Sequence, residues 1–484
     1  MQLQKLLQNI PYTNIQGTEQ IEINHIVYDS RKVEKGDVFV CISGFQTDGH
    51  RYIPMALEKG AVAIVTEREI SDIPKNVTVI QTENNRKTLA QMAVVYYENP
   101  TKSLCMIGVT GTNGKTSITY YIQSILSEAG NKTGVIGTIE NRIGDTIIPT
   151  ERTTPESLEL QALLQRMKQE NVSHVMMEVS SHSLDLHRVD GVAYDVAVFT
   201  NLTQDHLDYH KTMENYQKAK GLLFAKSEKS VINMDDDAGQ YMADCAKGSV
   251  MTYGIDKDAD LKAEQIVVSA EGTTFTLLYK QKSYAVQLHT PGRFSVYNAL
   301  GAIGACLCLG MDIETVLKGI SKNKGIAGRF QSIHSKKGCT AIVDYAHTPD
   351  GLVNVLKTAR EFAKGRLIAV FGCGGDRDKT KRPIMGECGG KFADYCILTS
   401  DNPRTEDPIQ ILRDVEVGTK SVTKNYEIEP DRKKAIQRAV SLANANDVIL
   451  IAGKGHETYQ IFADKTIHFD DVEEVQNAFG EDCL

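Results

Sequence analysis

The stretch Met106–Ser117, which reads MIGVTGTNGKTS, decides the fold expected for the centre of this chain. An apolar run leads through glycines to a Lys-Thr pair that opens a helical stretch. Phosphate binding needs close backbone N–H groups at a helix N-terminus, a cation and a hydroxyl for Mg²⁺. The backbone N–H groups would come from the turn with Gly111 and Gly114, the cation from Lys115 and the hydroxyl from Thr116. The spacing departs from G-x4-GK[ST], and a bare strand-to-helix turn is the alternative, but the combination favours a nucleotide-binding loop.

Outward from this loop, apolar runs alternate with amphipathic helical stretches, as in KTGVIGT, SHVMMEV and YDVAVFTN. Runs that are apolar at every residue are typical of parallel strands covered on both faces. We therefore predict a central P-loop ATPase domain with a mostly parallel sheet over residues 101–330. The runs TAIVDY, RLIAVFG, YCILTS and DVILIAG predict a Rossmann-like, doubly wound α/β domain over 331–484. The runs DVFVCI, AVAIVTE and VTVIQTE predict a small α/β domain over 1–100. The expected fold class is α/β with three domains.

Composition excludes several other classes of protein. The 484 residues carry 54 Lys and Arg against 62 Asp and Glu, a net charge of −8. A sequence-independent nucleic-acid binder needs a basic face, so nucleic acid is not an expected partner. There is no signal-peptide pattern and no apolar run long enough to cross a bilayer, so we expect a cytoplasmic monomer without membrane insertion. The ten cysteines lack CxxC spacing, and FGCGGDRD does not satisfy the GxGxxG pattern of a dehydrogenase.

Together with the later motifs, GTNGKT resembles the phosphate loop of the Mur ligase family of ATP-dependent amide-forming enzymes, and the similarity runs along essentially the whole chain. The resemblance implies that ATP, with Mg²⁺, phosphorylates a carboxylate of UDP-N-acetylmuramoyl-L-alanyl-D-glutamate. The amine of meso-diaminopimelate then attacks the acyl phosphate. Other readings stay open: an L-lysine-adding enzyme, another Mur-type ligase such as a folylpolyglutamate synthetase, or a nucleotide-gated binding or switch protein, because a phosphate loop alone does not show turnover.

Candidate catalytic residues lie in the middle domain. Glu178 ends the strand-like run SHVMMEV, at the edge where open α/β sheets bind ligands, and with Thr116 it could hold Mg²⁺. By resemblance, His206 of NLTQDHLDYH is a further metal-site residue. Lys220 of ENYQKAKGLLF matches a lysine that the family carbamylates with CO₂, although without the resemblance it reads as a surface lysine. These residues and Lys115 form the expected catalytic set.

The nucleotide contacts implied by the resemblance come from two domains. Asn298 of PGRFSVYNALGAI matches an adenine-contacting asparagine, although a helix-capping Asn is the alternative. Arg329 and Asp344 match contacts from the third domain, so ATP would bridge two domains and closure would exclude water. The full expected set is Gly111, Thr112, Asn113, Gly114, Lys115, Thr116, Asn298, Arg329 and Asp344.

The same resemblance assigns the other substrates. The uridine nucleotide would contact Tyr28, Ser30, Phe45, Gln46 and Thr47 in the first domain. The sugar peptide would contact Thr153, Thr154, Ser180 and Arg188. The incoming amino acid would contact Arg377, Asp401, Asn402, Pro403, Arg404, Gly453 and Glu457. A zwitterionic side-chain end requires one cation beside one anion, which Arg404 and Glu457 would supply; for the DNPRTEDP segment a solvated polar loop is the alternative.

Overall fold

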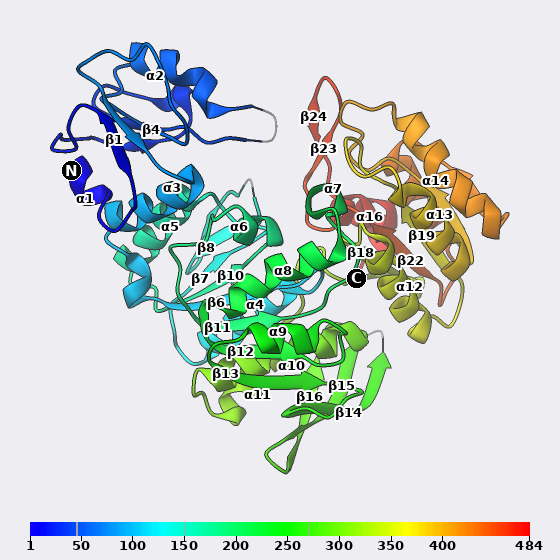
Figure 1. Ribbon diagram of the computed structural model, residues 1–484. Helices are drawn as coiled ribbons and strands as arrows, with labels where there is room; N and C mark the ends of the chain where they lie inside the picture. Colours follow the sequence, from blue (N-terminus) through cyan, green and yellow to red (C-terminus); the bar gives the residue numbers. More distant parts are fainter. Residues whose placement is uncertain (45–46, 151, 270) are drawn as a thin grey trace.

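The computed structural model describes residues 1–44, 47–150, 152–269 and 271–484. Its strands form sheets of five, eleven and six members in chain order, with one additional two-stranded hairpin. The first and third parts of the chain lie on either side of the middle part (Figure 1). The expected α/β class with three domains is confirmed, whereas the exact domain boundaries stay a prediction.

The first sheet is mixed, with strand order β1-β5-β4-β3-β2, and only β1 runs antiparallel to its neighbour. The three predicted runs form β3, β4 and β5, whose buried Val, Ile and Phe side chains pack against helices on both faces. The strands are β1 (Thr13–Gln16), β2 (Ile26–Val27), β3 (Val38–Val40), β4 (Ala63–Thr66) and β5 (Thr78–Gln81). The α-helices are α1 (Leu3–Leu6), α2 (Ile53–Glu58) and α3 (Asn85–Tyr96).

The middle sheet has the order β16-β15-β14-β13-β12-β11-β6-β10-β7-β8-β9. Its strands are β6 (Cys105–Thr110), β7 (Thr133–Ile136), β8 (Asn141–Ile143), β9 (Thr146–Ile148), β10 (His174–Glu178), β11 (Tyr194–Phe199), β12 (Ser227–Asn233), β13 (Ser249–Gly254), β14 (Leu261–Ser269), β15 (Gly272–Tyr279) and β16 (Lys282–Leu288). Its helices are α4 (Lys115–Glu128), α5 (Ser157–Gln169), α6 (Ser181–Asp185), α7 (Leu207–His210), α8 (Met213–Phe224), α9 (Gly239–Cys245), α10 (Arg293–Cys308) and α11 (Ile313–Ser321).

The central strands β7, β10, β6, β11, β12 and β13 are parallel, as predicted. One face packs on α4, α10 and α11 and the other on α5 and α8, so both faces of β6 are covered. Antiparallel extensions, β8–β9 on one side and β15–β16 on the other, lengthen the sheet. These antiparallel strands were not predicted from the sequence. The parallel order brings the carboxyl ends of β6, β10 and β11 to one edge, where the predicted site residues follow.

The third sheet has the order β17-β18-β22-β19-β20-β21, parallel except for β17. Its strands are β17 (Gln331–His334), β18 (Thr340–Asp344), β19 (Leu367–Phe371), β20 (Tyr395–Leu398), β21 (Tyr426–Ile428) and β22 (Val448–Ala452), and the hairpin is β23 (Tyr459–Ile461) with β24 (Thr466–His468). The helices are α12 (Pro349–Phe362), α13 (Lys381–Phe392), α14 (Pro408–Val422), α15 (Arg432–Leu442) and α16 (Asp471–Phe479). Helices on both faces make this sheet doubly wound, as predicted.

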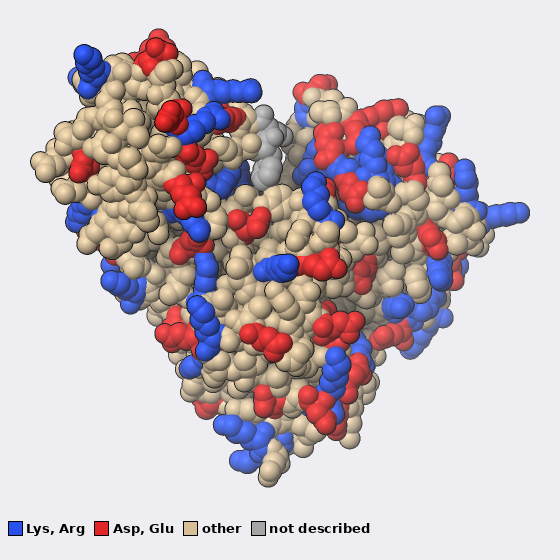
Figure 2. Space-filling model, in the orientation of Figure 1, with Lys and Arg blue, Asp and Glu red and all other residues tan. Residues whose placement is uncertain are grey.

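Figure 2 shows Lys and Arg intermingled with Asp and Glu over one face of the molecule, and a notch between the first and third domains. Neither sign of charge dominates this face, which agrees with the modest net charge of the chain. Among the described residues, no helix is both long and apolar enough to cross a membrane.

Candidate functional site

The phosphate-loop candidate is the turn that joins β6 to α4. Gly111 has φ +148° and Gly114 has φ +89°, and a Cβ at Gly111 would lie 1.7 Å from the hydroxyl of Thr200. A Cβ at Gly114 would lie 2.4 Å from Oδ1 of Asn298. Glycine is required at both positions because a side chain would be strained and would collide. Gly114 also precedes the first residue of α4, so the helix N-terminus opens directly from the loop.

Two lysines converge on the carbonyl oxygen of Gly111. Nζ of Lys115 donates to Gly111 O at 2.9 Å and to Thr112 O at 2.8 Å, while Nζ of Lys220 donates to Gly111 O at 2.8 Å. Lys220 comes from α8 and its side chain is only 1% exposed. Burial lowers the pKa of Lys220 well below its usual value, and the neighbouring Lys115 acts in the same direction. The expectation that Lys220 could be a surface lysine is therefore wrong, and its burial favours the neutral amine.

Glu178 ends β10 beside the first turn of α4. Its Oε1 accepts hydrogen bonds from the hydroxyl of Thr116 at 2.9 Å and from the backbone N–H of Thr138 at 3.0 Å. Its Oε2 accepts from the hydroxyl of Thr138 at 2.9 Å, and Thr138 in turn contacts the hydroxyl of Thr153 at 3.0 Å. The carboxylate is buried. Carboxylate and hydroxyl oxygens are the ligands Mg²⁺ prefers, so this group has the right donor chemistry for that ion.

His206 immediately precedes α7 and has a left-handed backbone with φ +56°. Its Nε2 lies 3.4 Å from a carboxylate oxygen of Asp205, and its ring lies 4.8 Å from that of His182. Desolvation lowers the pKa of His206; Asp205 opposes this shift, whereas the cations Lys115 and Lys220 reinforce it. A neutral imidazole is the form that binds metal ions.

A cavity of about 440 Å³ lies between the middle and third domains. The residues around it include members of the phosphate loop, the end of β12, α10 and the third domain: Asn113, Gly114, Asn233, Asp235, Tyr297, Asn298, Arg329, Asp344, His347 and Asp350. Asn298 lies inside α10, whose N-cap is Gly292. The helix-capping alternative for Asn298 is therefore wrong.

Direct contacts link the third domain to the phosphate loop. Nη2 of Arg329 donates to the hydroxyl of Thr116 at 3.1 Å, and the amide of Asn113 donates to Asp350 at 3.2 Å. Nε of Arg329 is buried without a hydrogen-bond partner in the described part of the chain. Asp344 holds the backbone around Arg329, because its carboxylate accepts from the N–H of Phe330 at 2.7 Å. The cavity therefore has one wall from the middle domain and one from the third domain, and the unpaired Nε of Arg329 lies beside it.

The four residues expected to hold the sugar peptide lie close together. The hydroxyl of Thr154 donates to the carbonyl of Glu178 at 2.8 Å and accepts from the N–H of Ser180 at 3.1 Å. Arg188 donates to the carbonyl of Thr154 at 3.4 Å, and its Nε is buried without a partner among the described residues. Thr153 reaches the same group through Thr138, as above. This cluster borders the carboxylate of Glu178.

The expected uridine residues are less clearly assembled. The hydroxyl of Tyr28 donates to Glu159 of α5 at 2.7 Å, which joins the first domain to the middle one. Ser30 contacts the sulfur of Met55 at 3.4 Å, and Thr47 contacts the hydroxyl of Tyr52 at 3.0 Å. No hydrogen bond joins these three positions within the described residues. Phe45 and Gln46 lie outside the residues that the structure describes.

Most residues expected to hold the amino acid surround Asn402, at the carboxyl edge of the third sheet. Its amide donates to Oε2 of Glu457 at 2.8 Å, and Nη1 of Arg404 donates to its carbonyl at 3.5 Å. Lys454 is fully buried and donates to Oδ1 of Asn402 at 3.2 Å and to Oε2 of Glu457 at 3.0 Å. Gly453 has φ +120°, and a Cβ there would lie 2.5 Å from the carboxylate of Asp401.

The remaining two residues lie on the neighbouring turn. Arg377 is exposed and donates to the carbonyl of Asp376 at 3.1 Å. The carbonyl of Pro403 lies so close to Gly375 that a Cβ there would approach it to 1.9 Å. The Asp401–Arg404 segment is largely buried and hydrogen-bonded, so the alternative of a solvated polar loop is wrong for this half of DNPRTEDP, whereas Thr405 and Asp407 are exposed.

Sequence reasoning missed Thr138 and Lys454. Thr138 lies two residues after the end of β7, and Glu178 is the last residue of the neighbouring strand β10. This position at the carboxyl end of a parallel strand was the signal that could have found Thr138. Lys454 lies in AGKGHE directly after the strand-like run DVILIAG, but a lysine between glycines gives no indication of burial. One of its acceptors, Glu457, is three residues away, but the other, Asn402, lies 52 residues earlier in the chain.

Comparisons with known proteins agree with this geometry. The description "Mur ligase family, catalytic domain" matches residues 22–104, "Mur ligase middle domain" matches 109–306, and "Mur ligase, glutamate ligase domain" matches 328–455. UDP-N-acetylmuramoyl-L-alanyl-D-glutamate–2,6-diaminopimelate ligase of Clostridium botulinum is 49% identical over 99% of this chain and 100% of its own length. A Clostridium acetobutylicum ligase of the same name, numbered 1, is 50% identical with the same coverage.

Solved structures agree as well. A structure of a UDP-N-acetylmuramoyl-L-alanyl-D-glutamate–2,6-diaminopimelate ligase superposes with a TM-score of 0.72 at 34% identity, covering 99% of this chain and 98% of that one. MurF ligase from Thermotoga maritima in complex with ADP has a TM-score of 0.65 at 21% identity, covering 95% and 97%. The second similarity concerns the fold alone.

Proposed function

This chain belongs to the Mur ligase family, and from that premise we propose that it is an ATP-dependent ligase of peptidoglycan precursor synthesis. It joins meso-diaminopimelate to UDP-N-acetylmuramoyl-L-alanyl-D-glutamate in the cytoplasm. The observation that carries the proposal is near 50% identity to such ligases over their whole length. The phosphate loop, facing a cavity shared by two domains, supports it.

In the proposed reaction, an oxygen of the D-glutamyl side-chain carboxylate bonds to the γ-phosphorus of ATP, and ADP leaves. The amine of the incoming amino acid then bonds to the acyl carbon, phosphate leaves, and the amine loses a proton. A carboxylate is a poor electrophile until it carries such a leaving group. The protein contributes mainly positioning and charge stabilisation. Lys115 is proposed to meet the β/γ-phosphate oxygens in place of the carbonyls it now contacts.

The nucleotide and Mg²⁺ assignments rest on the unpaired Nε of Arg329 and on the oxygen donors around Glu178. We propose that Gly111–Thr116 wrap the phosphates and that Asn298 faces the adenine across the cavity. Arg329 and Asp344 would complete the nucleotide site from the third domain. Thr116, Glu178 and His206 would hold Mg²⁺, which neutralises phosphate charge when bound.

We propose that Lys220 reacts with CO₂ to form a carbamate. Its burial and depressed pKa support this, because the neutral amine is the form that adds to CO₂. The addition releases a proton, and the carbamate would place an anion beside Lys115. The anion would attract the ammonium of Lys115, whose Nζ contacts the same carbonyl of Gly111 as Nζ of Lys220.

We also propose which residues bind the UDP-linked dipeptide and the incoming amino acid. Arg188, whose Nε is buried without a partner among the described residues, would bind the pyrophosphate or peptide carboxylates together with Thr153, Thr154 and Ser180. Tyr28, Ser30 and Thr47 would bind the uridine nucleotide. Arg377 and Arg404 would bind carboxylates of the amino acid, and Glu457, with Asp401, Asn402, Pro403 and Gly453, would surround its distal ammonium. The protein is proposed to act as a monomer.

The decisive experiment measures ADP release with each substrate omitted in turn. We expect release only when ATP, Mg²⁺, the UDP-linked dipeptide and meso-diaminopimelate are all present, and formation of one amide per ADP. Equal turnover with L-lysine would support the lysine-adding alternative. Release with folate and glutamate in place of these substrates would support a folylpolyglutamate synthetase. ATP binding with no release under any amino acid would support a nucleotide-gated switch.

Replacing Arg404 by Ala is expected to lower the preference for meso-diaminopimelate over L-lysine, measured as the ratio of kcat/KM values, by about 30-fold or more. The reason is that loss of a charged partner for the distal carboxylate costs about 2 kcal/mol or more. The exposed Arg413→Ala variant on α14 is the control. An unchanged ratio in the Arg404 variant would contradict the assignment.

A further inference from the structure

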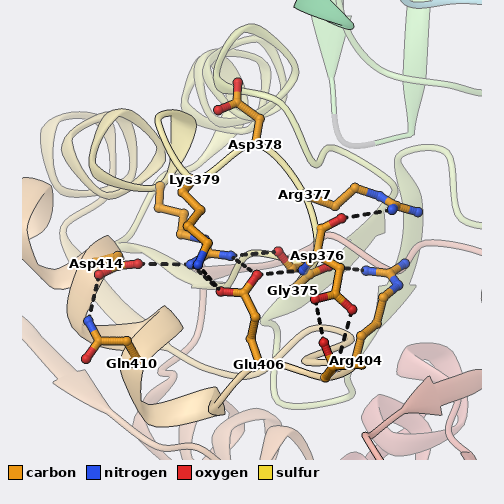
Figure 3. A network of polar contacts seen from close by, with 12 residues as sticks. Gly375, Asp376, Arg377, Asp378, Lys379, Arg404, Glu406, Gln410 and Asp414 are labelled. Atoms are coloured by element: carbon orange, nitrogen blue, oxygen red, sulfur yellow. Dashed lines mark hydrogen bonds and ion pairs between the residues drawn. The ribbon is translucent and has the colours of Figure 1, made fainter. Parts of the chain in front are cut away.

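Two neighbouring loops of the third domain carry the arginines proposed to bind the amino-acid carboxylates. The first loop, Gly374–Thr380, carries Arg377, and the second, Asp401–Asp407, carries Arg404. Arg404 donates to the carbonyl of Gly375 at 2.9 Å, and Arg377 donates to that of Asp376 at 3.1 Å (Figure 3). The two guanidinium groups therefore rest on consecutive carbonyls of one turn. The spacing of the two cations depends on how that turn is held.

The turn is held mainly from the second loop. Oε1 of Glu406 accepts from the N–H of Asp376 at 2.6 Å, and the carboxylate of Asp376 accepts from the hydroxyl and the N–H of Thr405 at 2.7 and 3.2 Å. Asp376 and Arg404 both have φ +53°. Non-glycine residues keep this left-handed backbone only where surrounding contacts impose it. The network thus constrains the backbone at Arg404 and at Asp376, the residue before Arg377.

Glu406 is itself held by a buried cation. Arg382 of α13 is fully buried, and its Nη2 and Nη1 donate to the two oxygens of Glu406 at 2.8 and 3.1 Å. Lys379 adds an ion pair at 2.9 Å (Figure 3). These cations lower the pKa of Glu406 to about 2, so the carboxylate is ionised under all physiological conditions. Each oxygen of Glu406 faces two donors. An NH₂ group in place of either oxygen would face those donors and could accept no hydrogen bond from them.

Arg382 has a second carboxylate partner that does not touch either loop. Asp414 of α14 accepts from Nη1 of Arg382 at 2.9 Å, and its other oxygen accepts from Gln410 of the same helix at 2.9 Å. Asp414 therefore shares the charge-pairing role of Glu406 but lacks its bond to the turn. Of the two acids, only Glu406 connects Arg382 to the arginine-bearing turn.

We propose that Glu406, braced by Arg382, is a positioning residue that sets the spacing of Arg377 and Arg404 and thereby selects an amino acid with a second carboxylate. The proposal rests on the function proposed above and deepens it. A carboxylate site discriminates well only when its cations are held in place by their own supporting contacts. If Glu406 no longer holds the turn, Arg377 and Arg404 remain but their relative placement is lost. The preference for meso-diaminopimelate over L-lysine should then fall, whereas the KM for ATP should not change.

The test compares Glu406→Gln with Asp414→Asn in the full-length protein. In either orientation of the Gln amide, its NH₂ group replaces one carboxylate oxygen and faces the donors that this oxygen bonded. The hydrogen bonds of Glu406 to these donors are therefore lost. We expect the KM for meso-diaminopimelate to rise about tenfold, equivalent to about 1.4 kcal/mol, and the preference over L-lysine to fall by a similar factor. The KM for ATP should change less than about twofold. Asp414→Asn should leave all of these values within about twofold of wild type. Both variants should lower the melting temperature, because each weakens an ion pair of the buried Arg382.

Equal effects of the two variants on KM and preference would overturn the proposal, because Glu406 would then act only by pairing Arg382. A parallel rise in the KM for ATP would also overturn it, since that indicates general loosening of the domain. If Glu406→Gln does not fold, Thr405→Val removes the 2.7 Å hydroxyl bond to Asp376 from the exposed side. It should lower the preference in the same direction, and an unchanged preference would count against the proposal. Failure of the proposed function is distinguishable, because the wild-type protein would then show no turnover with meso-diaminopimelate.

Discussion

Replacing Lys115 by Ala is expected to lower ADP release at saturating substrates by about 10³-fold, because it removes the cation at the start of α4. Loss of one well-placed group that stabilises transition-state charge costs about 10²–10³-fold in rate. In the structure the ammonium already lies at the loop, 2.9 Å from the carbonyl of Gly111. The measurement is coupled detection of ADP with all substrates present.

The control for Lys115 is Lys102→Ala, which removes an exposed lysine shortly before β6. It should turn over at the wild-type rate. Thermal melting should show both variants folded. Near-normal ADP release by the Lys115 variant would remove the phosphate-loop assignment and, with it, the proposed nucleotide site.

Replacing Lys220 by Ala is expected to lower turnover by about 10²-fold or more, by the same reasoning on charge placement. The side chain is buried, contacts the carbonyl of Gly111, and lies with Nζ 4.4 Å from the ring centroid of Tyr216. If the working group is a carbamate, a short carboxylate such as formate or acetate should enter the space left by the side chain and restore part of the rate. Mass spectrometry is a weaker test because a carbamate is labile.

Lys218→Ala is the matched control, since Lys218 is exposed on the same helix two residues away. Neither its rate nor its response to added carboxylate should differ from wild type. Full activity of the Lys220 variant would contradict any role for this lysine. Loss without rescue by carboxylates would contradict the carbamate and favour a role for the amine itself.

Short sequence motifs predicted the elements whose backbone conformation is set by residues adjacent in the chain. The run MIGVTGTNGKTS predicted β6, the turn and α4, because backbone conformation there follows from two glycines and a helix start. Apolar runs also predicted the parallel core and the doubly wound third sheet. The antiparallel strands β8, β9, β15 and β16 were not predicted. Polar residues interrupt these strands, which therefore lack the continuous apolar runs that marked the parallel core.

The candidate site was predicted residue by residue through resemblance, but not the contacts that join its parts. Nothing near Thr116 in the sequence indicates that Arg329 reaches its hydroxyl from another domain. Nothing in ENYQKAKGLLF indicates that Lys220 is buried against the phosphate loop. Both contacts join residues that lie about 100 or more positions apart in the chain, and no local pattern can report a distance of that kind.

By itself, the sequence determined the class of chemistry, because a Gly, Lys and Thr turn after a buried strand builds an anion-binding helix start wherever it occurs. It also determined which charges are available for an amino acid with two charged ends. Only the tertiary structure decided which of those charges meet. Burial depresses the pKa of Lys220. Glu406 and Arg382 hold the turn beneath two arginines, and Lys454 donates to the side chain of Asn402. Each of these results arises from desolvation and from contacts between distant segments, which exist only once the chain has folded.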